Sequence, residues 1–592
     1  MNFQLIYTAT ILILMSFFLI KEYFKPSYTV FTALILLTLG GVINIREAFA
    51  GFSNTGMLTV AILYVISTSL QASGLIDNII NILLKGRGGI GVRTYIRFMF
   101  PVSFISAFIN NTPVVAALIP AVKRWARKND IAPSRILIPI SYAAILGGVC
   151  TLIGTSTNLV VHGMMIQRGI EGFGFFEITK IGLPIALLGI LWVAFIGKRV
   201  LPDRKDIIQN LGQNAREFVT EMKVNSQFPH IGKTIHAAGL RHLKGLFLFQ
   251  IERQGEIIAP VSPDEKIYEG DRLFFTGLPE TIVDLQKIPG LEVVKDSEFD
   301  LSNYDSDVLK LYEAVVSQSS NLVGKNIRES NFRSVYDAVI LAIHRSGERI
   351  KQKVGDIVVR AGDTLLLLAK DGFDKKWYNK SDFSLVSKSV DVYSKPKWKI
   401  IFSAVVFVLM IIVASLKILP LILAASLAAV LLVGVGVISL DRAKDSVDLN
   451  VLLIIASSFG IGKALENSGL AQLIAKGIIG NLQIFGEVGV IAGIFFLTSI
   501  YTELITNNAA AAIMFPIAYS TATIAGMNPR PLFIVLAIAA SASFATPIGY
   551  QTNLMVYGPG GYKFMDFIKI GVLMNIFVGI AVTIIAWLLF YM

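Results

Sequence analysis

Cysteine, histidine and charged residues are all scarce in this chain of 592 residues. Its single cysteine excludes a disulfide framework, and with only five histidines no metal-binding cluster stands out. Charged residues make up 16% of the sequence and hydrophobic residues 54%, whereas a soluble domain carries roughly 25% charged residues. This shortage of charge indicates a membrane protein.

Motifs of catalysis are also lacking. The sequence shows no pairing of a nucleophile with a base and no phosphate-binding loop of the GxxxxGK[ST] type. We therefore expect neither an enzyme nor an ATP-driven pump, and no organic cofactor. The net charge of +12 gathers at the ends of apolar runs, which is a signal of membrane topology, so nucleic acid polymers are not expected as partners.

The apolar runs divide the chain into membrane blocks at 1–200 and 398–592, separated by a polar insert at 203–395. A spanning helix needs about 20 apolar residues. Candidate spans lie at 4–21, 28–44, 52–73, 134–162, 177–197, 398–418, 421–440, 450–470, 530–558 and 568–591. The first lacks the features of a signal peptide and is expected to be a retained helix. The basic pair at 198–199 indicates a multi-pass protein of the inner (plasma) membrane with a cytoplasmic insert.

A further apolar stretch at 98–122 lies between two basic clusters. The clusters are Lys85, Arg87, Arg93 and Arg97 on one side, and Lys123, Arg124, Arg127, Lys128 and Arg135 on the other. If both are cytoplasmic, 25 residues at about 1.5 Å each are too few for two spans, which predicts a re-entrant hairpin. The alternative is one ordinary span with one cluster outside. The second block has a corresponding stretch at about 489–520.

The two membrane blocks repeat each other. Ser73-Gly74-Leu75 recurs as Ser468-Gly469-Leu470, Gly154 as Gly549 and Thr157-Asn158-Leu159 as Thr552-Asn553-Leu554, all 395 residues apart. Asn110-Asn111 recurs as Asn507-Asn508. With five crossings in each block, the second is inverted relative to the first. We expect a polytopic α-helical fold of two inverted repeats, each with about five spans and one re-entrant hairpin, which is typical of transporters.

Four polar clusters occupy matching positions in the two blocks. The hairpin tips carry Asn110-Asn111-Thr112-Pro113 and Thr506-Asn507-Asn508, and the spans 134–162 and 530–558 are interrupted at 154–158 and 545–553. A half-helix is expected to restart at Pro113. Side-chain and backbone oxygens suit Na⁺, and helix N-termini suit an anion. The alternative is that these residues only bridge helices by hydrogen bonds. Glu503 is the acid nearest to them, and whether it is functional or lies at a wet hairpin base stays open.

At these clusters the chain resembles the divalent anion:sodium symporter family, which carries sulfate or dicarboxylates and is of the elevator type in the ion-transporter superfamily. The resemblance covers both membrane blocks and implies Na⁺ as coupling ion and a homodimer. It implies sodium-binding residues Asn110, Asn111, Gly154 and Thr155 in the first block and Thr506, Asn507, Asn508 and Gly549 in the second. It implies substrate-binding residues Asn111, Thr112, Thr157, Asn158, Asn508, Thr552 and Asn553.

The chain departs from that family in its hairpin tips. Ser-Asn-Thr is replaced by Asn-Asn-Thr and by Asn-Asn-Ala, so Ala509 lacks a hydroxyl that the family would use on its substrate. The segment ATPIGYQTNLMVYGPGGY is similar to the sulfate-associated branch. We expect a sodium-coupled sulfate symporter. Thiosulfate, molybdate and dicarboxylates stay open as substrates, as do a proton or sodium exchanger and a membrane sensor as alternative functions.

The polar insert has a repeat of its own. Its motifs at Gly232, Arg253 and Asp271 recur 92 residues later at Gly324, Arg345 and Asp363. The alternation of apolar and polar residues and the Gly-Asp turns predict two small α/β modules, at 205–292 and 296–385. Both are similar to the TrkA C-terminal domain, which implies a regulatory role. A small ligand such as a cyclic dinucleotide is a possible partner, with unknown binding residues.

Overall fold

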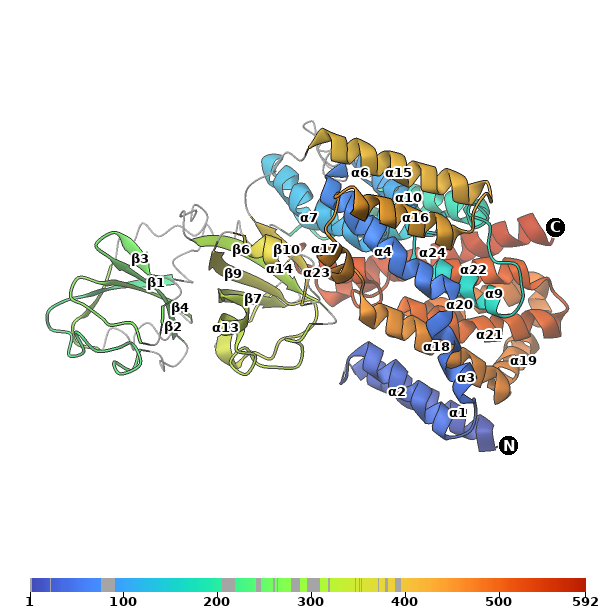
Figure 1. The fold of residues 1–592 in the computed structure, drawn as a ribbon, viewed down its shortest axis with the longest axis horizontal. Coiled ribbons are helices and arrows are strands. Elements are labelled where there is room, and N and C mark those ends of the chain that lie inside the picture. The colour runs from blue at the N-terminus through green and yellow to red at the C-terminus, as the bar shows by residue number, and fades with distance from the viewer. Residues whose placement is uncertain are drawn as a thin grey trace. The chain divides into compact units, whose positions relative to one another are not determined.

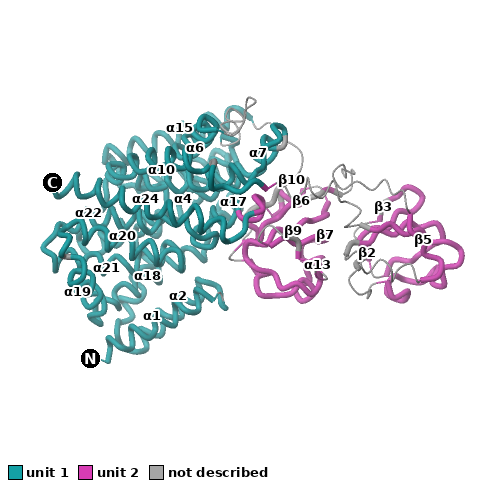
Figure 2. Tube along the Cα trace, turned by 180° about the vertical axis from the view of Figure 1, so that it is seen from behind, with its two compact units in different colours: residues 1–203, 393–556, 562–592 teal, residues 204–392, 557–561 magenta. Residues whose placement is uncertain are grey.

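The computed structural model describes residues 3–21, 23–75, 91–204, 219–240, 246–258, 261–262, 264–277, 288–294, 309–317, 320–345, 348–350, 352, 354–370, 372–377, 382–388 and 396–592. The chain forms two compact units (Figure 2). The first unit, here called the membrane unit, consists of Met1–Asp203, Tyr393–Val556 and Tyr562–Met592, and the second consists of Arg204–Val392 and Tyr557–Gly561. Lys85, Arg87 and the predicted module starts at 205–218 and 296–308 lie outside the described residues.

The first half of the membrane unit is helical (Figure 1). Its elements are α1 (Phe3–Lys21), α2 (Pro26–Leu39), α3 (Ile45–Phe49), η1 (Ala50–Ser53), α4 (Thr55–Ser73), α6 (Val92–Ser106), α7 (Asn111–Lys128), η2 (Pro133–Arg135), α8 (Leu137–Gly148), α9 (Ser156–Gln167) and α10 (Thr179–Val200). Local sequence sets several of these ends. Asn54 caps α4 by accepting from the Gly56 N–H, and Gly74 ends the helix in the left-handed conformation that glycine adopts at little cost.

The second half has the same succession of helices. Its elements are α15 (Lys397–Ser415), α16 (Leu421–Gly434), α17 (Leu440–Asp445), α18 (Leu449–Asn467), α19 (Leu470–Leu482), η6 (Gln483–Phe485), α20 (Gly486–Leu504), α21 (Asn507–Ala525), α22 (Pro529–Ser541), α23 (Gln551–Tyr557) and α24 (Phe564–Phe590). The helices α2 and α16 begin 395 residues apart, as do α9 and α23. This agreement supports a repeat of elements, whereas the inversion of one half across the membrane stays a prediction.

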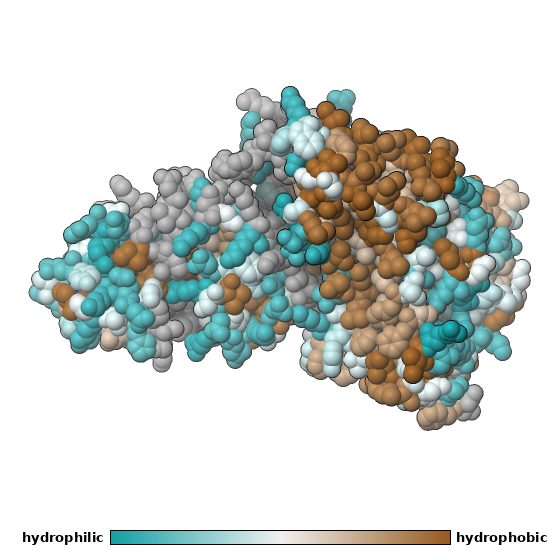
Figure 3. Space-filling model, viewed as in Figure 1, coloured by the Kyte–Doolittle hydropathy of each residue, from teal (hydrophilic) through white to brown (hydrophobic). Residues whose placement is uncertain are grey.

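The membrane unit has the surface of a protein that lies in lipid. Eight helical segments of the described residues are long and apolar enough to cross a membrane. Both α20 and α21, the two arms of the second predicted hairpin, are among them, so the re-entrant path of this stretch stays a prediction. Hydrophobic residues cover the visible face of the unit around α15 and α16 (Figure 3), where Ile401 and Leu427 are more than half exposed. Exposed apolar patches of this kind mark a membrane or protein contact, and on helices long enough to span a bilayer they fit contact with lipid.

The second unit holds two five-stranded antiparallel sheets. Their strands are β1 (Val219–Val224), β2 (Leu246–Arg253), β3 (Glu256–Ile258), β4 (Arg272–Gly277), β5 (Leu291–Val293), β6 (Leu309–Val316), β7 (Ala338–Arg345), β8 (Glu348–Arg349), β9 (Thr364–Lys370) and β10 (Phe383–Lys388). The sheet orders are β3-β2-β4-β1-β5 and β10-β6-β9-β7-β8, which are the same order read from opposite edges. The strands β2 and β7 begin 92 residues apart, as do β4 and β9, in agreement with the predicted spacing.

The repeated arginine and aspartate of the insert form a buried ion pair in each module. Arg253 donates to both carboxylate oxygens of Asp271, at 2.8 and 3.0 Å, and Arg345 does the same to Asp363, at 2.8 and 2.7 Å. Each aspartate is fully or almost fully buried. The hydrogen bonds that Arg253 donates to Asp271 and Glu265 outweigh desolvation and raise the pKa of Arg253. These motif residues therefore hold each sheet to its Gly-Asp turn.

Candidate functional site

The predicted tip of the first hairpin contains the buried side chain of Asn111, the first residue of α7. The amide nitrogen donates to the carbonyl oxygens of Ala144 (3.1 Å) and Gly154 (3.3 Å), and the amide oxygen accepts from the Tyr550 hydroxyl (2.6 Å). Because carbonyl oxygens only accept, this orientation satisfies both ends of the amide. Gly148 leaves room for it, since a Cβ there would lie 2.7 Å from the Asn111 side chain. The tip is therefore attached to both interrupted helices.

An asparagine braces each interrupted helix in the same way. Asn158 donates to the backbone oxygens of Gly148 (3.3 Å) and Thr151 (2.7 Å). Asn553 donates to the backbone oxygens of Ser543 (2.9 Å) and Thr546 (3.1 Å). In both cases the acceptors precede the asparagine by ten and seven residues. Helix interruptions leave backbone carbonyls without helical partners, and these amides replace the missing hydrogen bonds.

The polar clusters of the two halves contact each other reciprocally. At the tips, Thr112 donates to the Gln551 side chain (3.0 Å), and Ser156 donates to the Asn508 side chain (2.9 Å). Ser156 and Gln551 are the first residues of α9 and α23, which correspond to each other in the repeat. Each hairpin tip therefore contacts the restarting helix of the other half.

Further hydroxyl contacts join the two interruptions directly. Thr155 and Tyr550 share a hydrogen bond of 3.2 Å, and the hydroxyls of Thr157 and Ser541 share another. Ser141 of α8 lies within hydrogen-bonding distance of Thr552 (2.8 Å) and Asn553 (2.7 Å). All four clusters thus meet in one polar region inside an otherwise apolar unit.

Three helices that are each longer than two turns begin in this region, namely α7, α9 and α21. Their first N–H groups have no partner within the helix and carry partial positive charge. The predicted site residues contribute amides, hydroxyls and glycine backbone, without a basic side chain. Among the described residues, no group of three or more His, Cys, Asp or Glu is placed to hold a metal. This chemistry suits an alkali cation and a small anion.

Several sequence expectations need correction in detail. The half-helix of the first tip begins at Asn111 and not at Pro113. Thr157 and Asn158 lie in the first turn of α9, and Thr552 and Asn553 in the first turn of α23, so they are helical and not part of the irregular backbone. Of the predicted residues, Asn110 lines a pocket with Tyr64, Ser67 and Ser156, and no side-chain hydrogen bond joins Asn507 or Thr506 to the others within the described part.

The sequence reasoning missed Ser141, Ser541 and Tyr550. Ser141 and Ser541 are single hydroxyls in apolar helices, each fully buried, and an isolated serine gives little signal. Tyr550 lies inside the interrupted segment that the sequence analysis singled out, but its reach to Asn111 and Thr155 depends on the packing of the two halves.

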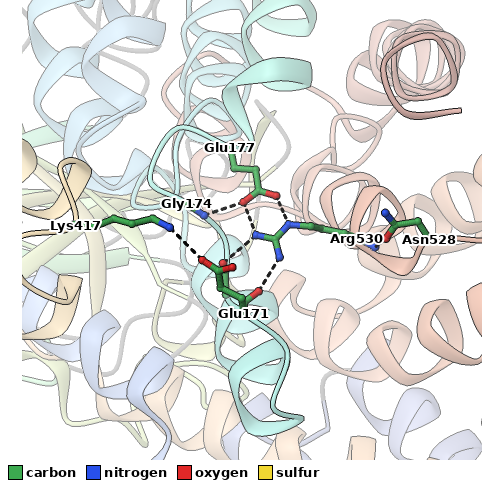
Figure 4. A network of polar contacts seen from close by, with 7 residues as sticks. Glu171, Gly174, Glu177, Lys417, Asn528 and Arg530 are labelled. Atoms are coloured by element: carbon green, nitrogen blue, oxygen red, sulfur yellow. Dashed lines mark hydrogen bonds and ion pairs between the residues drawn. The ribbon is translucent and has the colours of Figure 1, made fainter. Parts of the chain in front are cut away.

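A charged network lies away from this region, at the loop between α9 and α10 (Figure 4). The Arg530 guanidinium donates to both oxygens of Glu177, at 2.5 and 2.8 Å, and to the backbone oxygen of Glu171 at 3.0 Å. Lys417 pairs with the Glu171 carboxylate at 3.1 Å. Burial alone would raise the pKa of Glu177, but the hydrogen bonds from Arg530 and the Gly174 N–H outweigh it and lower that pKa. The network fastens a loop of the first half to the start of α22.

The comparisons agree with a transport function. The citrate transporter family model matches residues 11–539. The chain is 38% identical, over 91% of its length and 94% of the relative, to the "Putative sulfur deprivation response regulator" of Chlamydomonas reinhardtii. It is 29% identical to an uncharacterized transporter of Synechocystis, over 100% of this chain and 98% of that one. It is also 26% identical to sodium/sulfate cotransporter 1 of Chlamydomonas reinhardtii, over 92% and 85%.

Proposed function

Because the chain belongs to the citrate transporter family, it is a polytopic secondary transporter and not an enzyme, and we propose that it is a sodium-coupled symporter of a small oxyanion, with sulfate as the substrate. The observation that carries this proposal is the reciprocal contact of each hairpin tip with the other half's restarting helix. Relatives named as sodium/sulfate cotransporters support both the ion and the substrate.

The substrate would bind among the helix N-termini. A sulfate carries two negative charges, and the predicted site residues include no basic side chain to neutralise them. Free N–H groups of α7, α9 and α21 and the hydroxyls around them would hold its oxygens. Thr112 and Asn508 lie at the tips where such an anion would sit, and each contacts the opposite half. Binding is then favoured when a cation is bound nearby, which is the physical basis for coupling.

Sodium would bind at the first tip and at its counterpart in the second half. The first site would comprise Asn110, Asn111, Gly154 and Thr155, and the second Thr506, Asn507, Asn508 and Gly549. The cross-contacts link any displacement of one tip to the other half's interrupted helix, which supports an elevator movement of the hairpin-bearing part within an inverted-repeat fold.

The insert and assembly complete the proposal. The two modules of the insert would lie in the cytoplasm beside the inner membrane as TrkA C-terminal domains. They would regulate a homodimer through a small ligand such as a cyclic dinucleotide. Their identical strand orders support descent from one module type.

The test is uptake of labelled sulfate into proteoliposomes, with and without an inward sodium gradient. The wild type should accumulate sulfate against its gradient, and the double variant Asn111→Ala/Asn508→Ala should not. Asn481→Ala is the matched control, because this asparagine is exposed on α19 and bonds only the Gly477 backbone oxygen of its own helix.

Two other results would change the proposal. Sodium-dependent uptake of succinate without sulfate uptake would keep the mechanism and replace the substrate by a dicarboxylate. Sodium-independent binding of sulfate without accumulation would contradict symport and support a sensor.

A further inference from the structure

Glu503, at the end of α20, is an acid inside the membrane unit without a basic partner. Its carboxylate accepts from the Ala545 N–H (2.8 Å), the Thr546 hydroxyl (2.7 Å) and the Asn575 amide (2.9 Å). All three donors are neutral, and among the described residues no lysine, arginine or histidine forms an ion pair with it. A charged group in such surroundings is expected to be paired or to bind a cation.

Three side-chain oxygens converge beside Gly549. A Cβ built on Gly549 would lie 2.7 Å from Glu503 Oε2, 2.7 Å from Thr546 Oγ1 and closer still to Ser543 Oγ. Ser543 is fully buried, and its hydroxyl has no hydrogen-bond partner among the described residues. A buried hydroxyl without a partner costs free energy unless something binds it, so its position beside the same glycine as a carboxylate oxygen points to a ligand.

The corresponding place in the first half is built differently. Gly148 and Thr151, 395 residues earlier, take the positions of Ser543 and Thr546, and Ser106 takes that of Glu503, because each lies four residues before the first asparagine of its tip. There the space beside Gly148 is filled by the Asn111 amide. The second half thus has a carboxylate and a hydroxyl where the first half has a serine and a glycine, which adds one negative charge.

We propose that Glu503, Ser543 and Thr546 form a monovalent-cation site, with sodium as its ion. One carboxylate and two neutral hydroxyls balance a single positive charge, whereas Ca²⁺ sites gather more oxygen ligands. The inference deepens the proposed function and rests on it only for the identity of the ion. Gly549 allows the three oxygens to approach, because any side chain at this position would displace them.

The alternative is that Glu503 only anchors the interruption between α22 and α23. Its bonds to Ala545 and Asn575 would then stabilise the backbone without any ion. The two roles differ in what a substitution changes. An anchor affects unfolding in the absence of sodium, whereas a ligand affects the sodium concentration at half-saturation.

The experiment is binding of ²²Na⁺ to the purified full-length protein in detergent, with choline replacing sodium at constant ionic strength. Glu503→Gln should raise the half-saturating sodium concentration of one site class by at least about tenfold, and Ser543→Ala should raise it less. Glu487→Gln on the same helix is the control, since Glu487 is exposed in the first turn of α20.

Ser543→Ala is the sharper variant, because it removes a hydroxyl that forms no hydrogen bond within the described residues and should leave folding intact. The proposal is overturned if both variants bind ²²Na⁺ like the wild type, even when Glu503→Gln unfolds at a lower temperature. It is also overturned if the wild type binds no ²²Na⁺. The binding assay needs neither sulfate nor transport, so a failure of sulfate uptake would not affect the proposed cation site. Conversely, wild-type sodium affinity in both variants would overturn this site without contradicting sodium-coupled symport.

Discussion

Replacing the single buried side chain of Asn158 by alanine is expected to destabilise the membrane unit strongly. The substitution removes donors to the Thr151 and Gly148 backbone oxygens, at 2.7 and 3.3 Å, in residues that are almost fully buried. A buried acceptor left without a partner costs about 1–3 kcal/mol, and the longer bond contributes less, so we expect a loss of about 2–4 kcal/mol. The Asn158 oxygen has no partner among the described residues, so no other bond is lost.

Equilibrium unfolding in mixed detergent and SDS micelles measures this loss. Asn553→Ala removes the corresponding brace and should cost the same within about 1 kcal/mol, because its donor bonds have the same spacing along the chain. Asn481→Ala, on the surface of α19, should change stability by less than about 0.5 kcal/mol. A loss below about 0.5 kcal/mol for Asn158→Ala would refute the bracing role. If sulfate binding were weakened as well, Asn158 would act as a substrate ligand.

Two further substitutions test the packing around the site and its periphery. Gly148→Ala places a methyl group 2.7 Å from the Asn111 side chain and should cost about 1–3 kcal/mol in the same unfolding assay, whereas Gly434→Ala, with open space around its Cβ, should not destabilise. The pKa of Glu177 is lowered in the folded protein, so its pairing with Arg530 stabilises the folded state at pH values above the ordinary carboxyl pKa of 4.5. This stabilisation is lost as the pH falls through the lowered pKa. Glu177→Gln should therefore reduce stability at pH 7, and the difference from the wild type should shrink in acid, as thermal unfolding at stepped pH values would reveal.

The sequence was informative wherever a signal lies within one segment. The polytopic membrane character is confirmed, because long apolar runs need no knowledge of their neighbours. The interruption near Gly154 was predicted from small and polar residues in an apolar run, and α8 does end at Gly148 before α9 begins at Ser156. Helix starts were less accurate, as Pro113 shows, since a helix can begin before the proline that favours its first turn.

Contacts between the halves were beyond the sequence. The pairing of Thr112 with Gln551 joins residues 439 positions apart, and no periodicity in either segment encodes it. The same holds for Ser543, whose hydroxyl gains meaning only from the carboxylate of Glu503 beside it. The assignments of individual residues to sodium or substrate stay predictions, as do the module boundaries of the insert.

The exchange of contacts between tips and restarting helices has an evolutionary consequence. Thr112 finds its partner in the second half, and Asn508 finds its partner in the first. Neither half alone holds both members of a pair, so a half-length ancestor would have needed a second copy of itself to build the same region. Duplication and fusion of such an ancestor would turn an association between two molecules into a property of one chain. Each copy would then have been free to diverge, and Glu503, which stands where the first half has Ser106, marks a difference between the two halves.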